Sequence, residues 1–280
     1  MIQLLLVSIL WALSFGFTAQ VADLGTPFVT AVRTVLAALV FLPFLDARGL
    51  GRRQILALAG IGALQFGLMY LLYIASFRWL RSSEVALFTI FTPLFVTLVD
   101  GLLEHRLRWR FLAAAGLAVA GTGICVWTRL EHRGLVLGFL VMQGANFCFA
   151  LGQVLYRRVA PATGKRDRDL MGLLFLGAAV VAVALAVPSV PWSRVAAMGF
   201  RSWAVLVYLG VVASGLGFFL FNAGARRTDI GTLAAFNNLK IPLAILASGL
   251  VFHEAVDWPR LAAGGAVLAL ALGLNRGGQP

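Results

Sequence analysis

The sequence predicts an all-α membrane protein, with ten transmembrane helices arranged as two inverted five-helix repeats. Its composition, the spacing of its charges and an internal repeat support this fold class. Of the 280 residues, 61% are hydrophobic and 12% are charged, whereas a soluble domain is about 45–50% apolar and about 25% charged. The mean hydropathy is +0.92. Such a chain lacks the polar groups to cover its own surface in water, so the composition excludes a soluble enzyme and a disordered or fibrous protein.

Charged residues separate apolar stretches that are long enough to cross a bilayer, which takes about 20 residues at 1.5 Å per residue. The spanning segments are expected to be helices, because the hydrocarbon core offers no water to satisfy backbone polar groups. In chain order, we expect spans at residues 2–21, 27–45, 54–77, 82–102, 109–128, 134–156, 170–187, 202–222, 229–251 and 258–275.

Basic residues in the connecting segments predict the orientation of the helices. With the N-terminus inside the cell, the cytoplasmic segments carry fourteen Lys and Arg residues and the outer segments carry seven. This bias predicts that both termini lie in the cytoplasm of a protein that crosses the membrane many times. The net charge of +12 is then a topology signal, to which anionic lipid at the inner face would contribute, and we expect no nucleic-acid partner.

An internal repeat divides the chain into residues 1–130 and 131–280, with five predicted spans in each. Shifting residues 86–124 by 149 positions aligns Pro93 with Pro242 and Trp109 with Trp258. Because each half has an odd number of spans, the second half inserts upside down. Inverted repeats are common in secondary transporters, which bind their substrate near the membrane midplane between the halves.

The fifth and tenth spans are rich in small residues. Gly265, Ala269 and Gly273 recur every four residues on one face of the tenth span, and Ala114 and Ala118 occupy similar positions in the fifth. Such stripes allow helices to pack closely in lipid. Packing within one bundle and a contact between two copies both remain open, so the sequence allows a monomer or a homodimer.

Lys240 is a basic residue near the middle of the ninth span, and it follows the amides Asn237 and Asn238. A charged residue within the membrane is costly and is a functional candidate. Pro242 leaves a backbone carbonyl free about one turn earlier, which suits a local kink that points polar groups into a cavity. We therefore expect Lys240, Asn237 and Asn238 to line a substrate site; the alternative is a lysine that reaches an interface or the carbonyls of a helix end.

Arg33 is the second basic residue predicted to lie inside the membrane, roughly 9 Å along the second span at 1.5 Å per residue. Glu84 lies near the outer end of the fourth span, within reach of a long arginine side chain. The two residues are expected either to form a structural ion pair or to act in transport. In the second case Arg33 binds an anion, or Glu84 takes up and releases a proton.

Further polar and aromatic residues complete the candidate site. Gln143 and Asn146 share one face of the sixth span, and Trp11, Tyr70 and Phe91 offer aromatic surfaces. The alternative role for the amides is hydrogen bonding between helices. Zinc-helix, phosphate-loop and nucleophile-elbow motifs are absent from the sequence, so we expect no enzyme activity, no cofactor and no metal. The residues alone thus predict a carrier for a small molecule that bears a carboxylate and hydrogen-bonding groups.

The chain resembles the EamA family of the drug/metabolite transporter superfamily. The resemblance rests on Ile9-Leu10-Trp11-Ala12 at the start of the first span, on Pro93 and Pro242, and on the glycine-rich fifth and tenth spans. A narrower resemblance links it to the biotin importers of the carboxylate/amino acid/amine transporter group. That resemblance is carried by Trp11-Ala12-Leu13-Ser14-Phe15, Arg33 with residues 36–45, Ser83-Glu84, Thr92-Pro93-Leu94, Asn146, residues 210–215, Asn222 and Asn237-Asn238. Lys240 departs from it, because these importers have a histidine there.

The narrower resemblance implies a secondary transporter that imports biotin by alternating access. The carboxylate of biotin needs a cation, for which Arg33 or Lys240 would serve. Its ureido group needs donors and acceptors such as those of Asn146, Asn237 and Asn238. The wider family leaves open an exporter of amino acids or related metabolites. A membrane protein without transport activity is disfavoured, because a scaffold has no need for a charge within the bilayer.

Overall fold

A computed structural model of the chain describes residues 2–80, 82–105, 134–190 and 192–251, with a few separate positions between 109 and 120 and between 258 and 267. Over these residues the chain is all helical, with no strand. The predicted spans 109–128 and 258–275, which carry the small-residue stripes, lie almost entirely outside the described residues. The repeat partners Trp109 and Trp258 are among the separate positions.

Several helices are continued by short π or 3-10 segments, labelled η. The described elements are α1 (Ile2–Val21), η1 (Ala22–Leu24), α2 (Thr26–Phe41), η2 (Leu42–Phe44), α3 (Arg52–Gly62), η3 (Ala63–Leu68), α4 (Met69–Ser76), α5 (Ser82–Phe88), η4 (Thr89–Phe91), α6 (Thr92–Leu103), α8 (Leu135–Val159), η5 (Ala160–Thr163), α9 (Asp167–Ala186), α10 (Trp192–Ala196), α11 (Phe200–Val207), η6 (Tyr208–Leu216), α12 (Gly217–Ala225) and α13 (Ile230–Val251).

Each predicted span within the described ranges corresponds to one of these helical stretches, with ends that agree within a few residues. Seven helical stretches among the described residues are long and apolar enough to cross a membrane. α13 has 22 residues, so at 1.5 Å per residue it has the length of a span too. The short helix α10 was not predicted.

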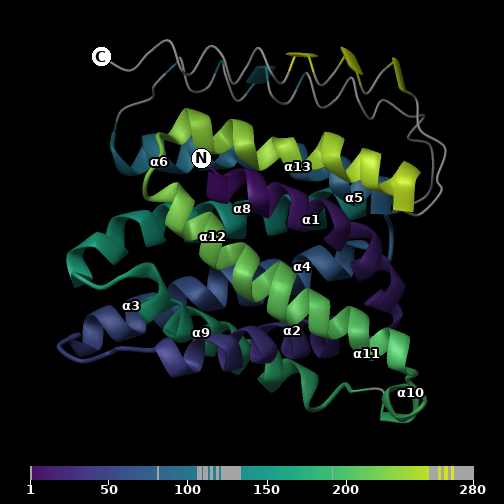
Figure 1. Cartoon of the computed structure of the whole chain (residues 1–280), viewed down its shortest axis with the longest axis horizontal. Coiled ribbons are helices and arrows are strands. Elements are labelled where there is room, and N and C mark those ends of the chain that lie inside the picture. The colour runs from purple at the N-terminus through teal and green to yellow at the C-terminus, as the bar shows by residue number, and fades with distance from the viewer. Residues whose placement is uncertain are drawn as a thin grey trace.

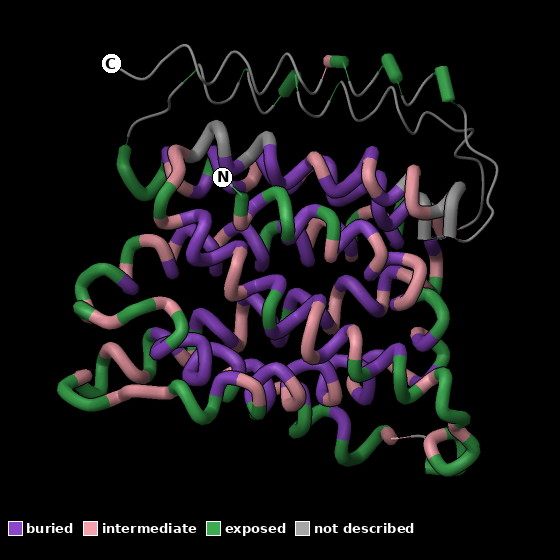
Figure 2. Tube along the Cα trace, in the orientation of Figure 1, coloured by how far each residue is buried: buried purple, intermediate pink, exposed green. Residues whose placement is uncertain are grey.

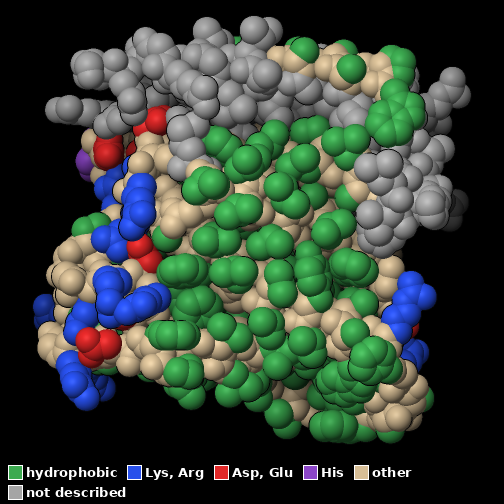
Figure 3. Space-filling model, viewed as in Figure 1, with side chains coloured by type: hydrophobic (Ala, Val, Ile, Leu, Met, Phe, Trp, Pro, Cys, Tyr) green, Lys and Arg blue, Asp and Glu red, His purple; other side chains and the backbone are tan. Residues whose placement is uncertain are grey.

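The helices pack side by side into one bundle, in which α1 lies between α13 and α12 (Figure 1). α8 packs against α4 and α6, and α2 and α3 pack against α9. Buried positions face the inside of this bundle, whereas the loops and the outer faces are exposed (Figure 2). Hydrophobic side chains cover the middle of the visible face, and Lys and Arg gather towards its left and right edges (Figure 3). A broad apolar band of this kind is the surface that lipid tails require.

The segments predicted to face the cytoplasm meet at one end of the bundle, which we call the basic end. At this end, the segments after α2, around η5 and after α12 contact one another. Ion pairs join Lys165 to Asp46, Arg158 to Asp100 and Arg226 to Asp167, and the backbone of Asp46 bonds to that of Asp169. At the opposite end, Arg194 donates to the carbonyl of Asp23 at 2.9 Å. The helices thus alternate in direction, as the predicted spans require.

Small residues bring α3 and α9 into direct backbone contact. A Cβ atom on Gly62 would lie 1.8 Å from the carbonyl oxygen of Leu174, and one on Gly177 would lie 2.0 Å from that of Ala59. Because lipid tails are as apolar as the helices, association depends on such close packing. These two glycines hold α3 and α9 at a separation that no larger residue permits.

Three of the spanning stretches depart from regular α-helix. η3 and η6 are π segments within the third and eighth predicted spans, and η4 is a 3-10 turn that interrupts the fourth span just before Pro93. π segments are frequent at functional sites. The ninth span is different, because α13 runs through Pro242 as one helix.

We expect Gly62→Ala to lower the free energy of unfolding by about 1–3 kcal/mol, because the added methyl group overpacks the contact with α9. Thermal unfolding in detergent, followed by tryptophan fluorescence, measures the effect. Gly60→Ala is the matched control on the same helix, since a Cβ atom there meets nothing within 4 Å. Equal stability of the two variants would contradict the close packing described above.

Candidate functional site

A cavity lies within the bundle, and its wall combines aromatic rings with a few polar groups. Five of the predicted site residues line it: Trp11, Arg33, Tyr70, Asn146 and Lys240. The other lining residues are Ser14, Phe15, Met69, Tyr73, Thr89, Thr92, Met142, Ala145, Phe149 and Phe218. The cavity volume is about 70 Å³, enough for a few water molecules, so a metabolite needs its walls to move apart.

Arg33 is 2% exposed and bonds to three hydroxyl groups. Its Nε donates to Ser214 at 3.1 Å, and its two terminal nitrogens donate to Thr18 at 3.1 Å and to Tyr70 at 2.7 Å. All three guanidinium nitrogens are thereby engaged. Glu84 is also buried but has other contacts, and these two described residues form no ion pair. The ion pair left open by the sequence is therefore not formed, because hydroxyl groups from other helices surround Arg33.

Lys240 is 7% exposed, and its surroundings differ from those of Arg33. Its Nζ donates to the amide oxygen of Asn237 at 3.1 Å and lies 5.3 Å from the ring centroid of Trp11 and 5.9 Å from that of Phe149. An ammonium group carries three hydrogens, and Asn237 accepts one of them. The described residues provide no acidic partner, so Lys240 keeps donor capacity at the cavity wall.

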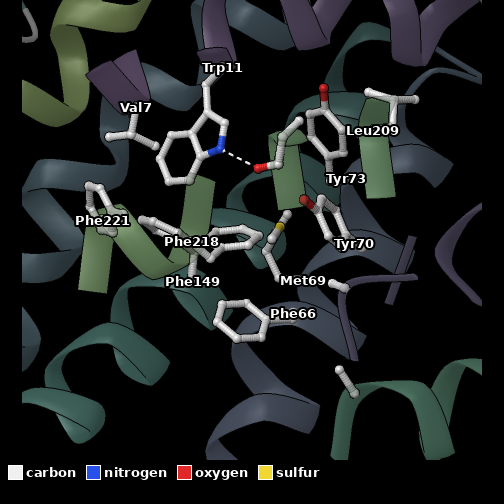
Figure 4. Packing of buried hydrophobic residues seen from close by; sticks show 14 of the residues in the cluster. Val7, Trp11, Phe66, Met69, Tyr70, Tyr73, Phe149, Leu209, Phe218 and Phe221 are labelled. Atoms are coloured by element: carbon white, nitrogen blue, oxygen red, sulfur yellow. Dashed lines mark hydrogen bonds between the residues drawn. The ribbon is translucent and has the colours of Figure 1, made fainter. Parts of the chain in front are cut away.

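The π segment η6 places polar atoms at the cavity edge. The hydroxyl of Ser214 donates to the carbonyl of Leu209 at 2.6 Å, accepts from Arg33 and contacts the Tyr70 hydroxyl at 2.8 Å. The carbonyl of Ala213 accepts a hydrogen bond from Nε1 of Trp11 at 2.8 Å, drawn as the dashed line in Figure 4. This irregular turn thus fixes the guanidinium on one side and the indole on the other.

The amides of the predicted site serve mainly to cap the broken fourth span. Asn146 donates to the carbonyl of Phe88 at 2.7 Å and accepts from Thr92 at 3.0 Å, and Asn238 donates to the carbonyl of Ile90 at 3.3 Å. Gln143 also reaches the carbonyl of Phe88, at 3.4 Å. Irregular backbone in a membrane needs such partners, so these amides hold α8 and α13 against η4.

Five predicted site residues do not line the cavity: Asn237, Asn238, Gln143, Phe91 and Glu84. Asn237 still belongs to its polar surroundings, because it contacts Lys240 and its Nδ2 is buried without a partner among the described residues. Phe91 is half-buried and packs against Phe139, with ring centroids 5.7 Å apart. Its ring thus packs on α8 and does not line the cavity.

Phe149 and Phe218 are cavity residues that the sequence analysis did not select. They form an aromatic floor with Trp11, Phe66 and Phe221, in which Phe218 lies 4.4 Å from Phe66 and 5.0 Å from Trp11 between ring centroids (Figure 4). A signal was present for Phe149, because it is three residues after Asn146 on α8 and shares a helix face with that predicted site residue. Phe218 follows the π segment η6, so regular helical spacing gives no such signal for it.

Comparison with known proteins assigns a family and a fold. The EamA-like transporter family matches residues 1–127 and 134–276. A protein of Salmonella typhimurium named biotin transporter is 37% identical over 99% of this chain and 93% of its own length. A protein of Pseudomonas aeruginosa named probable biotin transporter is 40% identical over 99% and 97%, respectively.

A biotin transporter of Escherichia coli is 36% identical over 99% of this chain and 93% of its own length. One crystal structure, 21% identical in sequence, superposes with a TM-score of 0.77 over 98% of this chain and 95% of that chain. This structural likeness shows a shared fold.

We expect Asn146→Leu to lower the free energy of unfolding by about 2 kcal/mol, because it leaves buried partners of Asn146 at the broken span unsatisfied. Thermal unfolding of the purified protein in detergent measures the loss. Phe147→Leu on the next position is the control, since Phe147 is 43% exposed. A midpoint that is equally unchanged in both variants would show that Asn146 does not hold the break.

Proposed function

The chain belongs to the EamA-like transporter family, and we propose that it imports biotin across the bacterial inner membrane. Membership makes it a multi-pass membrane transporter rather than an enzyme. The proposal of biotin as the substrate draws on relatives that are 36–40% identical over nearly the whole chain and carry the name biotin transporter or probable biotin transporter. The chemistry of the cavity gives independent support.

The observation that carries the proposal is Lys240, a buried cation with unused donors at the wall of the cavity. A carboxylate in this position receives a charge-assisted hydrogen bond from Nζ of Lys240 and a second bond from the unpartnered Nδ2 of Asn237. Arg33 is less suited to this role, because its three nitrogens already donate to hydroxyl groups. We therefore assign the carboxylate of biotin to Lys240.

The remaining parts of biotin match the rest of the wall. Its apolar ring and chain suit the faces of Trp11, Phe149 and Phe218. Its ureido group needs one donor and two acceptors, which the hydroxyl groups near Arg33 and the remaining guanidinium hydrogens provide. The distance between the two cations then sets the length of ligand that the site accepts.

We further propose the architecture of ten helices in two inverted halves, residues 1–130 and 131–280, with both termini in the cytoplasm. A π segment in the third and in the eighth predicted span, the corresponding spans of the two halves, supports this proposal. The concentration of Lys and Arg at the basic end supports the orientation. Alternating access then opens the cavity towards one end of the bundle at a time.

Biotin uptake in a growing cell tests the proposed function. The chain is expressed in a biotin-auxotrophic strain that lacks its own importer, and uptake of labelled biotin is measured at nanomolar supply. We expect uptake well above that of cells with the empty vector. An excess of unlabelled biotin should suppress it, whereas an excess of an amino acid should leave it unchanged. Uptake no higher than the empty vector would contradict the proposal.

We expect Lys240→Met to weaken biotin binding at least tenfold, a loss of about 1.4 kcal/mol, because the carboxylate loses its cation. Equilibrium binding of labelled biotin to the purified protein measures this change. Biotin amide, which lacks the charge, should bind the original protein weakly and lose nothing further in the variant.

Arg48→Met is the control, since it removes one positive charge from an exposed loop. Equal losses for biotin and biotin amide in Lys240→Met would show that Lys240 shapes the cavity without pairing with the carboxylate.

A further inference from the structure

Three buried amide side chains lie on neighbouring helical stretches outside the lining of the central cavity, and several of their polar atoms have no partner among the described residues. Gln65 in η3, Gln153 in α8 and Asn222 in α12 are each at most 1% exposed. Nε2 of Gln65 donates to Oδ1 of Asn222 at 3.2 Å. Among the described residues, Oε1 of Gln65, both polar atoms of Gln153 and Nδ2 of Asn222 have no hydrogen-bond partner. We call these three residues the amide cluster.

The amide cluster lies on the far side of the aromatic floor from the cavity. Gln153 is one helical turn beyond Phe149 on α8, and Asn222 is one turn beyond Phe218 on α12, in both cases towards the basic end. The backbone of α8 runs so close to η3 that a Cβ atom on Gly152 would lie 2.4 Å from Cβ of Gln65. The cluster is therefore shared by the third, sixth and eighth predicted spans.

A further turn along the same helices reaches a polar contact that closes the basic end. Asp167 at the start of α9 accepts from the Tyr156 hydroxyl at 2.7 Å and from Arg226 at 2.7 Å. Asp167 and Arg226 also line a second cavity of about 410 Å³, whose wall is mainly basic and also contains Gln3, Phe219 and Ala223. The basic residues are Lys165, Arg166, Arg168, Arg226 and Arg227. This basic cavity suits an anion.

The succession of these groups describes a route from the central cavity to the basic end. Moving along α8 and α12, the cavity is followed by the aromatic floor, the amide cluster and the Asp167 contact, and Asp167 and Arg226 of that contact also line the basic cavity. Unpartnered polar atoms in a protein interior are destabilising, and apolar side chains of similar size would relieve that cost. Three such amides on one route indicate that they bind something when the aromatic floor opens.

We infer that the amide cluster is a second, transient substrate site on the route between the central cavity and the basic end. After the carboxylate has left Lys240, the cluster would accept an uncharged group of the urea or amide class, which both donates and accepts hydrogen bonds. This inference rests on the proposed function, which supplies such a group in the ureido ring of biotin. The basic cavity would attract the carboxylate at the end of the passage.

The test compares transport with binding in Gln153→Leu, which removes the amide and nearly preserves the volume. The purified protein is reconstituted in liposomes, and initial biotin uptake and equilibrium biotin binding are measured. We expect the maximal uptake rate to fall at least fivefold, while the dissociation constant stays within twofold of the original. The thermal midpoint should be unchanged or higher, because the substitution removes two unpartnered polar atoms.

Two further variants make the result specific. Gln153→Asn keeps an amide at this position and should retain most of the uptake rate. Thr30→Val is the matched control: Thr30 is fully buried, bonds to the carbonyl of Thr26 in its own helix at 2.8 Å, and lines neither cavity. Its loss of a buried polar group should leave uptake unchanged.

Unimpaired uptake by Gln153→Leu, with biotin binding intact, would overturn the second site. A loss of binding equal to the loss of uptake would overturn it as well, because the amide would then belong to the central site. If the original protein binds no biotin, the proposal that biotin is the substrate is wrong, and the ureido ring no longer identifies the group that the cluster binds. The binding measurement on the original protein thus separates the two failures.

Discussion

The membrane interior contains no water, so every polar group within the bundle has to find a partner in the protein. This constraint determines where the chemistry of the site lies. The 3-10 turn η4 interrupts one span and exposes backbone carbonyls, and Asn146 and Asn238 reach across from neighbouring helices to bond them. The π segment η6 presents Ser214 and the carbonyl of Ala213, and these hold Arg33 and Trp11. Thr89 of η4 lines the cavity, as do Arg33 and Trp11, the two residues that η6 holds.

The two buried cations illustrate two ways of meeting the same constraint. Arg33 distributes its hydrogens among hydroxyl groups of three helices, so it ties the wall together and is held in one orientation. Lys240 has Asn237 as its hydrogen-bond acceptor and two aromatic rings nearby. A buried charge with few partners is costly, and a carboxylate ligand relieves that cost. The same burial that makes an unpaired Lys240 costly is therefore what supports the proposal of an anionic substrate.

Contacts at the basic end close one side of the bundle. The aromatic floor separates the cavity from the amide cluster, and the Asp167 contact ties the start of α9 to α8 and to the end of α12. Arg158 adds a contact with Asp100 at 3.1 Å near the end of α6. Ion pairs of this kind at a water-facing end are individually weak, so each contributes little to holding this end together. The tight glycine contacts of α3 with α9 are, by contrast, fixed by the backbone itself.

The sequence by itself determined the helices, because hydropathy and charge spacing are local properties of the chain. It also placed the loops at the correct ends of the helices relative to one another, and it singled out Lys240, Arg33, Trp11, Tyr70 and Asn146 as candidates that do line the cavity. A polar residue type within a long apolar segment was a sufficient signal for Lys240, Arg33 and Asn146, whereas Trp11 and Tyr70 were candidates as aromatic surfaces. The aromatic floor escaped detection, because phenylalanine is too common in an apolar chain to be informative alone.

Only the tertiary structure decided what each polar group does. Phe91 was a candidate from the sequence, but it lies in the 3-10 turn η4 and packs against Phe139. Glu84 is within reach of Arg33 by side-chain length, but hydroxyl groups bond the guanidinium. Asn146 and Asn238 became caps because the break in the fourth span lies beside them. Each outcome depends on which helices are neighbours and on how π or 3-10 turns shift their faces. Those are contacts between residues far apart in the chain, and no local pattern records them.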